Sequence, residues 1–454
     1  MNLHKATSKR RRVGPALEWT LGKGVWGEQE AWRVSTAHLQ ATYPARASAT
    51  LGTHGIYIGR DLSGGAAFVH DPWAAYNAGV AMGANMMILG ALGQGKSGLI
   101  KRRALRQRLR RDRRVGITDV KDEYGPLMEA VDGESLALYR GGPTRLNPMR
   151  PGPDGTVADE LMRGVAGAAT GRALTPAERA GLDAAVELVT AAAVGENREP
   201  TVPELVKLLL APTAGLTDRV VGESDAEVRK ELRELGLALK QLVDGPMSGM
   251  FDGPTTAALN WNAPAVRLDL SQVRENLALG VLMVAWMAFL RQAHETRAEE
   301  CERLGIPVPK TERDNDEAWR PAAIPGIAET WVSEYKLSRS TGTANLLAFH
   351  KLSDISAGVA DGTAAAKLLD GLFEDTGTIV MFKHKTPEAA HETASRLGHG
   401  STVEQTLMSL RQDQALWQIG PRLWHVHHET TAYERSVTYT DAAMQEHGTT
   451  RSPA

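Results

Sequence analysis

The sequence of 454 residues has a single cysteine, Cys301, which has no partner within the chain for a disulfide. A disulfide scaffold is therefore excluded, and a non-covalent core must hold the fold together. Long apolar runs are also lacking, since the longest, residues 277–290, covers only 14 positions. A helix that crosses a bilayer needs about 20 apolar residues, so this run predicts a buried helix rather than a transmembrane segment.

A secretory signal is lacking as well. The basic residues at 9–12 are not followed by the apolar segment that a signal peptide requires. We therefore expect a reduced, soluble, cytoplasmic protein. Hydrophobic residues make up 42% of the chain and charged residues 23%, as in ordinary globular proteins and unlike disordered ones. The length suggests about three structural units, or one large α/β domain with an insertion.

The net charge of −2 conceals two unequal parts. Residues 1–114 hold 19 Lys/Arg against 6 Asp/Glu, a net charge of +13, so the rest of the chain carries −15. Such a split predicts either an anionic partner for the basic part or attraction between neighbouring subunits.

The pattern of an α/β sheet begins near residue 55. Two short apolar segments, 56–58 and 67–69, flank a Ser-Gly-Gly turn and predict a hairpin. Residues 85–89 predict a strand that runs into a glycine-rich loop and a long helix, and 115–118 predict the next strand, which ends at Asp119. Strand, loop, helix and strand in this order are typical of a parallel sheet.

Residues 155–246 have the periodicity of an all-helical insertion. Three helix starts of the capping-box form Ser/Thr-x-x-Glu occur in it: Thr175 with Glu178, Thr201 with Glu204, and Ser224 with Glu227. The α/β pattern then returns, with apolar segments at 265–270, 344–349 and 377–382 and two closing strands at 415–419 and 423–427.

Residues 90–97 read Gly-Ala-Leu-Gly-Gln-Gly-Lys-Ser and match the phosphate-binding pattern G-x-x-x-x-G-K-[ST] at every specified position. In such a loop the glycines let backbone N–H groups point at the phosphates, Lys96 reaches the β and γ phosphates, and Ser97 ligates Mg²⁺. An apolar strand precedes the loop and a helix follows it, as the motif requires. We therefore predict a nucleotide site formed by Gly90, Gly93, Gln94, Gly95, Lys96, Ser97 and Gly98.

Residues 101–114 contain nine Lys/Arg, which supply most of the positive excess. One interpretation is a solvated helix face, with Leu105 and Leu109 turned inward at i, i+4 spacing. The other is a surface for DNA phosphates or for an acidic neighbouring subunit, although the run lacks aromatic residues that could stack on bases.

From residue 55 onward, the order of motifs resembles the motor ATPases of conjugation and type IV secretion, the Vir/Tra assembly ATPases of the FtsK/HerA superfamily. The resemblance covers roughly residues 55–430 and looks closest to the actinobacterial members. Besides the phosphate loop, the motifs that carry it begin at Gly55 (GIYIGRD), Asp71 (DPW), Thr118 (TDVKDEY), Leu146 (LNP), Gly249 (GMFDG), Val266 (VRLDLS), Asp316 (DEAW), Lys336 (KLSR) and His350 (HKLSD).

The resemblance implies an α/β fold, namely a RecA-like P-loop NTPase core with a mostly parallel sheet and an all-helical subdomain inserted after the second core strand. It also implies ATP and Mg²⁺ as cofactors, a homo-oligomer such as a hexamer, and membrane-embedded conjugation or secretion proteins as partners at the inner face of the cell membrane. We accordingly expect a basic N-terminal segment at 1–50, a core at 51–154 and 247–435, the insertion at 155–246 and a flexible tail at 436–454.

Roles at the site also follow from the resemblance. Asp316 would hold Mg²⁺ together with Ser97, and Glu317 would polarise the attacking water. Arg339 is a candidate arginine finger for its own or a neighbour's γ-phosphate, the alternative being a surface cation. His350 occupies a sensor position, or else is a polar cap at a strand end.

One stretch departs from the family pattern. A central parallel strand is buried on both faces and should read as an apolar run, but residues 310–315 are Lys-Thr-Glu-Arg-Asp-Asn. We expect no buried strand with this sequence. Either Asp316 and Glu317 sit on an altered loop, or another segment supplies the strand, or hydrolysis has weakened. Asp119, counted among the cofactor-binding residues, and then Asp269 are the next candidates for the acid.

Three functions remain in view. The leading hypothesis is an ATP-hydrolysing motor of a conjugative DNA transfer or type IV secretion-like apparatus. The second is a nucleotide-binding structural subunit with weak hydrolysis, suggested by the polar stretch at 310–315. The third is a DNA translocase of the FtsK/HerA type, which would use the basic stretch at 101–114.

Overall fold

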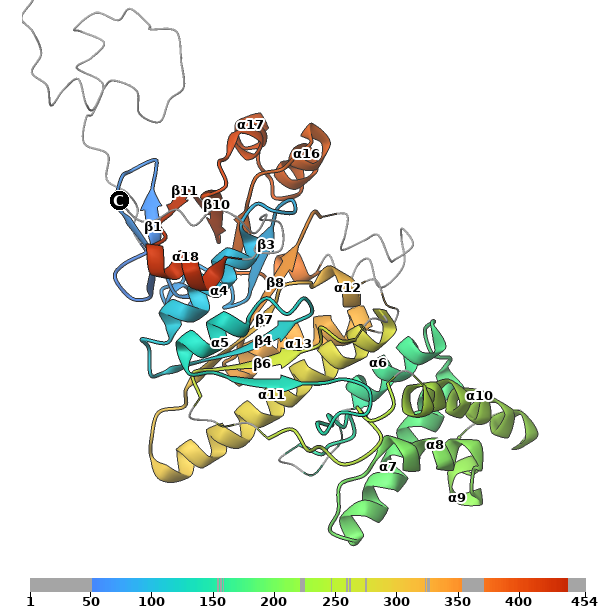
Figure 1. The fold of residues 1–454 in the computed structure, drawn as a ribbon. Helices are drawn as coiled ribbons and strands as arrows, with labels where there is room; N and C mark the ends of the chain where they lie inside the picture. Colours follow the sequence, from blue (N-terminus) through green and yellow to red (C-terminus); the bar gives the residue numbers. More distant parts are fainter. Residues whose placement is uncertain are drawn as a thin grey trace, which may run out of the picture.

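One eleven-stranded sheet organises the protein, whose structure is a computed structural model (Figure 1). The strand order is β2-β1-β11-β10-β9-β3-β8-β7-β4-β6-β5. The structure describes residues 51–439, apart from 153–154, 156, 158, 221–224, 246, 259, 261–262, 274–275, 323, 325–326 and 353–370. The expected segment at 1–50 lies outside the described residues.

The larger part of the sheet is parallel, and the rest is antiparallel. The parallel strands, in spatial order, are β9 (Thr378–Met381), β3 (Met86–Leu89), β8 (Ala344–Phe349), β7 (Lys310–Asn315), β4 (Arg113–Asp119), β6 (Ala265–Asp269) and β5 (Glu134–Ala137). The antiparallel strands are β10 (Gln414–Ile419), β11 (Arg422–His428), β1 (Ile56–Asp61) and β2 (Ala67–His70). The mostly parallel α/β sheet, the hairpin expected at 56–69 and the two closing strands expected at 415–427 are confirmed.

Helices cover both faces of the sheet (Figure 1). On one face lie α4 (Lys96–Gln107), α5 (Gly125–Val131) and α18 (Ala432–Thr438), and on the other lie α11 (Asn276–Leu304) and α13 (Ile327–Thr341). Strand β3 shows why both layers form, because all four of its residues are buried and alternate between two cores. Met86 and Ile88 join the core under α4, whereas Met87 and Leu89 join the core under α11.

The described part of the core domain also contains four short helices: α3 (Pro72–Asn77), α12 (Trp319–Ala322), α16 (Pro387–Arg396) and α17 (Ser401–Ser409). The carboxylate of Asp71 caps α3 by accepting the N–H of Ala74 at 2.8 Å. Helices α16 and α17 lie between β9 and β10 in the sequence and pack against each other, which no sequence pattern predicted. Helix α18 continues to Thr438, past the boundary expected for the core at residue 435.

The helical insertion lies to one side of the sheet, away from β10 and β11 (Figure 1). It contains α6 (Asp159–Thr170), α7 (Pro176–Gly195), α8 (Val202–Leu210), α9 (Ala214–Thr217) and α10 (Asp225–Asp244). The capping boxes at Thr175 and Thr201 are present, because Glu178 and Glu204 accept the N–H groups of these residues at 2.8 and 2.9 Å. Ser224 lies outside the described residues.

The helical insertion follows an additional strand that the sequence did not predict. After β4, the second core strand, the chain forms α5 and then β5, which pairs with β6 at the edge of the sheet. Only after β5 does the chain enter the insertion. The short segment Glu134–Ala137 is half exposed and has no apolar run, so no sequence pattern predicted a strand there.

The basic stretch at 101–114 is not a continuous helix. Helix α4 ends at Gln107, and β4 begins at Arg113, two residues earlier than expected. The proposed inward packing of Leu109 was wrong, since this side chain is 84% exposed. Conversely, Lys101 and Arg103 are fully buried, so the stretch is not simply a solvated face.

The expectation that residues 310–315 form no buried strand was also wrong. These residues form β7, which lies between β8 and β4, and Glu312, Arg313, Asp314 and Asn315 are each 1% exposed. The strand is tolerated because most of these side chains have a buried partner. Glu312 accepts two hydrogen bonds from Arg103 of α4, at 2.9 and 3.1 Å. On the other face, Asn315 accepts a hydrogen bond from Thr118 at 2.7 Å.

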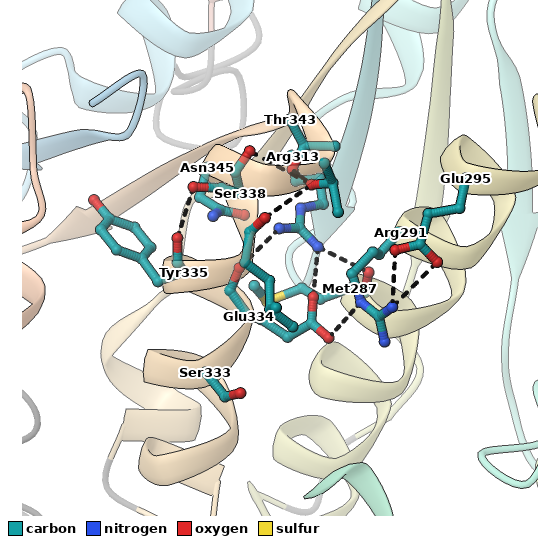
Figure 2. A network of polar contacts seen from close by, with 12 residues as sticks. Met287, Arg291, Glu295, Arg313, Ser333, Glu334, Tyr335, Ser338, Thr343 and Asn345 are labelled. Carbon is teal, nitrogen blue, oxygen red and sulfur yellow. Dashed lines mark hydrogen bonds and ion pairs between the residues drawn. The ribbon is translucent and has the colours of Figure 1, made fainter. Parts of the chain in front are cut away.

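Arg313 extends from β7 into the layer of α11 and α13 (Figure 2). Its guanidinium donates to the Glu334 carboxylate at 2.8 Å and to the Met287 carbonyl at 3.1 Å. Glu334 also accepts from Arg291, which in turn contacts Glu295. The buried charge of the strand is thus distributed over two helices, so no net charge is isolated in the core.

Helix α11 contains the longest apolar run. Its segment Leu277–Leu304 is long and apolar enough to cross a membrane, with a mean hydropathy of 1.4, but 83% of the apolar window is buried inside the protein. A membrane-spanning helix would expose this surface to lipid. The helix therefore packs as the core helix expected from the sequence.

Candidate nucleotide-binding site

The phosphate loop connects β3 to α4, as the sequence predicts. Two of its glycines are required by the backbone. At Gly90 a Cβ would lie 2.5 Å from the Cβ of Phe382, and Gly95, which precedes α4, has a φ of +96° in the left-handed region. The loop therefore passes close to β9 and then turns sharply, so that the N-terminus of α4 faces the loop's concave side.

Lys96 is held inside this loop. Its ammonium donates to the carbonyls of Gly90 and Ala91, at 2.6 and 3.1 Å, and lies 3.0 Å from Nδ1 of His350. Because an ammonium has only donors, Nδ1 of His350 must be the acceptor and the imidazole proton sits on Nε2. One buried cation, Lys96, therefore joins the phosphate loop to the segment directly after β8, and it faces the position of the phosphates.

Asp316 follows β7 and lies next to Ser97. Its carboxylate accepts hydrogen bonds from the Ser97 hydroxyl and, at 2.9 Å, from the Tyr124 hydroxyl. Burial raises the pKa of Asp316, although the Ser97 hydrogen bond opposes this effect. A hydroxyl and a carboxylate side by side are oxygen ligands of the kind that Mg²⁺ takes together with waters and phosphates. The two residues therefore fit a magnesium ion.

Glu317 is buried and forms an ion pair with Lys121 from the loop after β4. Its carboxylate also accepts the indole N–H of Trp319, and Nε2 of His350 lies 3.9 Å away. Burial acts to raise its pKa, but Lys121 and Trp319 outweigh burial and hold the pKa of Glu317 below its ordinary value. Glu317 is therefore a carboxylate at neutral pH, as a water-polarising base must be.

These residues open onto one cleft of about 860 Å³. Eight residues expected from the sequence line it: Gly93, Gly95, Lys96, Ser97, Gly98, Asp316, Glu317 and His350. Lys121 and Glu123, from the loop after β4, line it too. Sequence reasoning missed the opposite wall, which comes from α4, β10–β11 and α18: Arg102, Arg411, Gln412, Asp413, His428, Thr430, Arg435, Thr438 and Tyr439.

The other two candidate acids serve local structure. Asp119 accepts the backbone N–H groups of Lys121, Glu123 and Tyr124 at 3.0 to 3.2 Å, so it shapes the loop that carries Lys121. Both Asp119 and Asp269 also pair with Arg267, at 2.9 and 3.0 Å. Neither residue lines the cleft. Their carboxylates are thus already engaged, which leaves Asp316 as the acid beside Ser97.

Arg339 lies in a different place from the other candidates. It is near the end of α13, where it donates to the Met82 carbonyl and lies over the ring of Tyr76 with 5.9 Å to its centroid. This position lines a separate cavity of about 360 Å³ at the start of β3 and β8, whereas the phosphate loop follows the end of β3. Arg339 therefore does not reach the phosphate site of its own chain.

The comparisons with known proteins agree with this architecture. No protein-family model and no curated protein matches the sequence. Among solved structures, VirB4 of Thermoanaerobacter pseudethanolicus is similar over 85% of this chain and 98% of its own, with a TM-score of 0.67 and 19% identity. The bacterial conjugative coupling protein TrwB is similar over 76% of this chain and 85% of its own, with a TM-score of 0.51 and 16% identity.

A second TrwB structure, in complex with the non-hydrolysable GTP analogue GDPNP, gives a TM-score of 0.53 at 16% identity, over 76% of this chain and 86% of its own. At such low identity the likeness establishes the fold. The chain therefore has the α/β, RecA-like P-loop fold expected from its motifs.

Proposed function

We propose that the chain is an ATP-binding and ATP-hydrolysing motor of a conjugative DNA transfer or type IV secretion-like apparatus. One observation carries the ATPase part. The phosphate loop, His350, and the pair Asp316 and Glu317 follow the carboxyl ends of three adjacent parallel strands, β3, β8 and β7. Ligands of open α/β sheets bind at this edge.

Each residue has a task that its position allows. The N–H groups of the loop and the ammonium of Lys96 bind the phosphates, and Ser97 and Asp316 would hold Mg²⁺, which supplies charge neutralisation at the transferring phosphoryl group. Glu317 orients and polarises the attacking water. Because Lys121 now pairs with Glu317, an incoming phosphate that attracts Lys121 would free the carboxylate.

The setting of this activity rests on the resemblance to conjugation ATPases and on the fold shared with VirB4 and TrwB. We propose a homo-oligomeric, hexameric assembly docked at the inner face of the cell membrane on membrane-embedded partners. Arg339 belongs to this part of the proposal. Since it does not reach its own site, its task as an arginine finger would be to contact the γ-phosphate of a neighbouring subunit.

The two alternative functions have less support. Weak hydrolysis was suggested by the polar stretch at 310–315, but this stretch is a buried strand that places Asp316 and Glu317 at the loop. DNA contact through 101–114 is limited, because only Arg108 and Arg111 of the nine cations are exposed, and Arg108 pairs with Asp132. The motor remains the function that the site supports best.

The test is nucleotide turnover by the purified chain, with and without DNA, against a Lys96→Ala control. We expect Mg²⁺-dependent ATP hydrolysis that the control lacks. Mass measurement with ATP and with ADP should reveal a hexamer. Turnover no higher than in the control, under conditions that favour oligomers, would contradict the proposal, and a wild-type chain that binds ATP without hydrolysing it would favour the structural-subunit alternative.

A further inference from the structure

The cations of residues 101–114 differ in what balances their charge. Lys101 lies 3.8 Å from Glu123, Arg103 pairs with Glu312, and Arg106 pairs with Glu434. Further along, Arg108 pairs with Asp132, and Arg113 with Asp71. Most of the positive charges in this stretch are therefore balanced by carboxylates of the same chain.

Within this stretch, neither Arg102 nor Arg111 pairs with a carboxylate in the part of the chain that the structure describes. Arg111 is exposed, so water and counterions balance its charge. Arg102 is only partly exposed and is one of the residues that line the nucleotide cleft. A desolvated charge without a partner is costly, so its retention at this place points to a ligand.

The position of Arg102 on α4 brings it to the phosphate loop. It is four residues after Gly98, and long helical side chains lean toward the N-terminus of their helix. Nη1 of Arg102 accordingly lies 3.3 Å from the position that a Cβ on Gly98 would take. The absence of a side chain at residue 98 thus leaves room for the guanidinium beside the first turn of α4.

The surroundings of Arg102 are positive. Burial and the neighbouring Arg106 lower the pKa of its guanidinium to about 10, and Arg435 of α18 acts in the same direction. Glu434 is the carboxylate that acts against them, but both of its oxygens accept hydrogen bonds from Arg106. An anion that enters the cleft here would therefore relieve repulsion as well as gain a hydrogen-bonded ion pair.

The polarity of the cleft identifies this anion. Lys96, His350 and Glu317 mark the end at which the γ-phosphate would lie, since they surround the loop on the side of β8 and β7. Arg102 is one helical turn beyond Gly98, on the side of α18 and β11. In a phosphate loop the backbone N–H groups hold the α and β phosphates, so the group that reaches Arg102 is on the nucleoside side.

We propose that Arg102 is a nucleotide-binding residue whose guanidinium pairs with the α-phosphate of the bound nucleotide. The assignment rests on the proposed ATPase function and adds a contact that the loop motif does not include. Such a contact is the same for ATP and ADP and does not change during hydrolysis. It therefore contributes uniform binding, which affects KM rather than kcat.

The test is the affinity of the full chain for a fluorescent ADP and a fluorescent ATP, together with steady-state hydrolysis. Arg102→Gln should weaken both nucleotides by the same factor, about 10-fold or more, as expected for a charged hydrogen bond. KM should rise by that factor while kcat changes little. Arg102→Lys should retain part of the affinity, and Arg111→Gln, which removes an exposed charge from the same stretch, should change neither constant.

Unchanged ADP affinity in Arg102→Gln would overturn the assignment, and so would a loss confined to ATP, which would place the contact at the γ-phosphate. A thermal melt of each variant separates a lost contact from a misfolded chain. If the wild-type chain bound no nucleotide, the proposed function would fail and this assignment with it. If the wild-type chain bound nucleotide and Arg102→Gln bound it equally well, the assignment alone would fail.

Discussion

Strand β7 and the two residues that follow it carry similar side chains with opposite uses. Within the strand, Glu312 and Arg313 are paired with partners from helices on the two faces of the sheet, so their charges hold β7 in place. Directly after the strand, Asp316 and Glu317 line the nucleotide cleft. The role of a buried charged side chain therefore depends on the groups that surround it. A charge paired within the fold supports structure, and a charge that lines a cleft is available for chemistry.

The largest effect is expected on ATP turnover, from a change at Glu317, which lines the cleft. Glu317→Gln keeps the shape of the side chain and removes its charge, so ATP turnover should fall about 100- to 1000-fold. The free energy of unfolding should fall only slightly, because Gln can still accept the indole N–H of Trp319 and loses only the ion pair with the partly exposed Lys121. Steady-state hydrolysis and chemical denaturation measure the two properties. Turnover within a few-fold of wild type would remove Glu317 from the reaction.

A change at the ion pair that holds β7 is expected to affect the stability of the fold. Arg103→Met removes the partner of Glu312 and leaves a buried carboxylate uncompensated, which should lower the free energy of unfolding by about 3–5 kcal/mol. The matched control is Arg103→Met combined with Glu312→Leu. Since the double variant contains neither charge, most of the stability should return. A loss that persists in the double variant would mean that Arg103 acts through its packing and its contact with His70, not through Glu312.

The smallest effect is expected at Asp314, which lies in β7 between the paired residues Glu312 and Arg313 and the cleft residues Asp316 and Glu317. Its carboxyl oxygens are buried and accept no hydrogen bond from a described protein donor, and burial together with Glu312 raises its pKa well above the ordinary value. The folded state therefore holds a proton here that the unfolded state loses above about pH 4, so the stability contributed by this group is lost as the pH rises through the raised pKa.

Asp314→Asn replaces the carboxyl group with an amide that does not titrate, so the variant lacks this pH-dependent contribution to stability. The variant and the wild type should have free energies of unfolding within about 1 kcal/mol at pH 5, and the variant should become progressively more stable than the wild type toward pH 8. Denaturation across this pH range provides the measurement. Asp218→Asn, at an exposed position of the insertion, is the control for the chemical change from Asp to Asn. A gap that closes toward pH 8 would mean that Asp314 is ionised in the folded chain.

Local patterns predicted much of the fold and of the site. The phosphate loop follows from residues adjacent in the sequence, and the outer hairpins and capping boxes follow from short-range alternation and turn residues. These signals need no knowledge of distant parts of the chain. Asp316 and Glu317 line the same cleft as the loop, but only the resemblance, and no local pattern, indicated them.

The features that were missed depend on distant partners. A strand reading Lys-Thr-Glu-Arg-Asp-Asn is acceptable in the core only because Arg103, 209 residues from Glu312, and Glu334, 21 residues from Arg313, face it. No rule applied to one segment can contain that information. The opposite wall of the cleft could not be predicted for the same reason. Its elements β10, β11 and α18 are brought near the loop by the order of strands in the sheet.

That order also has a consequence for the time at which the site is completed during synthesis. Strand β1 pairs with β11, so Gly59 lies beside His428, and a Cβ on Gly59 would meet the His427 carbonyl at 1.9 Å. While residues near 430 are still inside the ribosome, the nascent chain has the phosphate loop but lacks the opposite wall of the cleft. Because pairings between distant segments form late, nucleotide capture should follow translation of nearly the whole ATPase core.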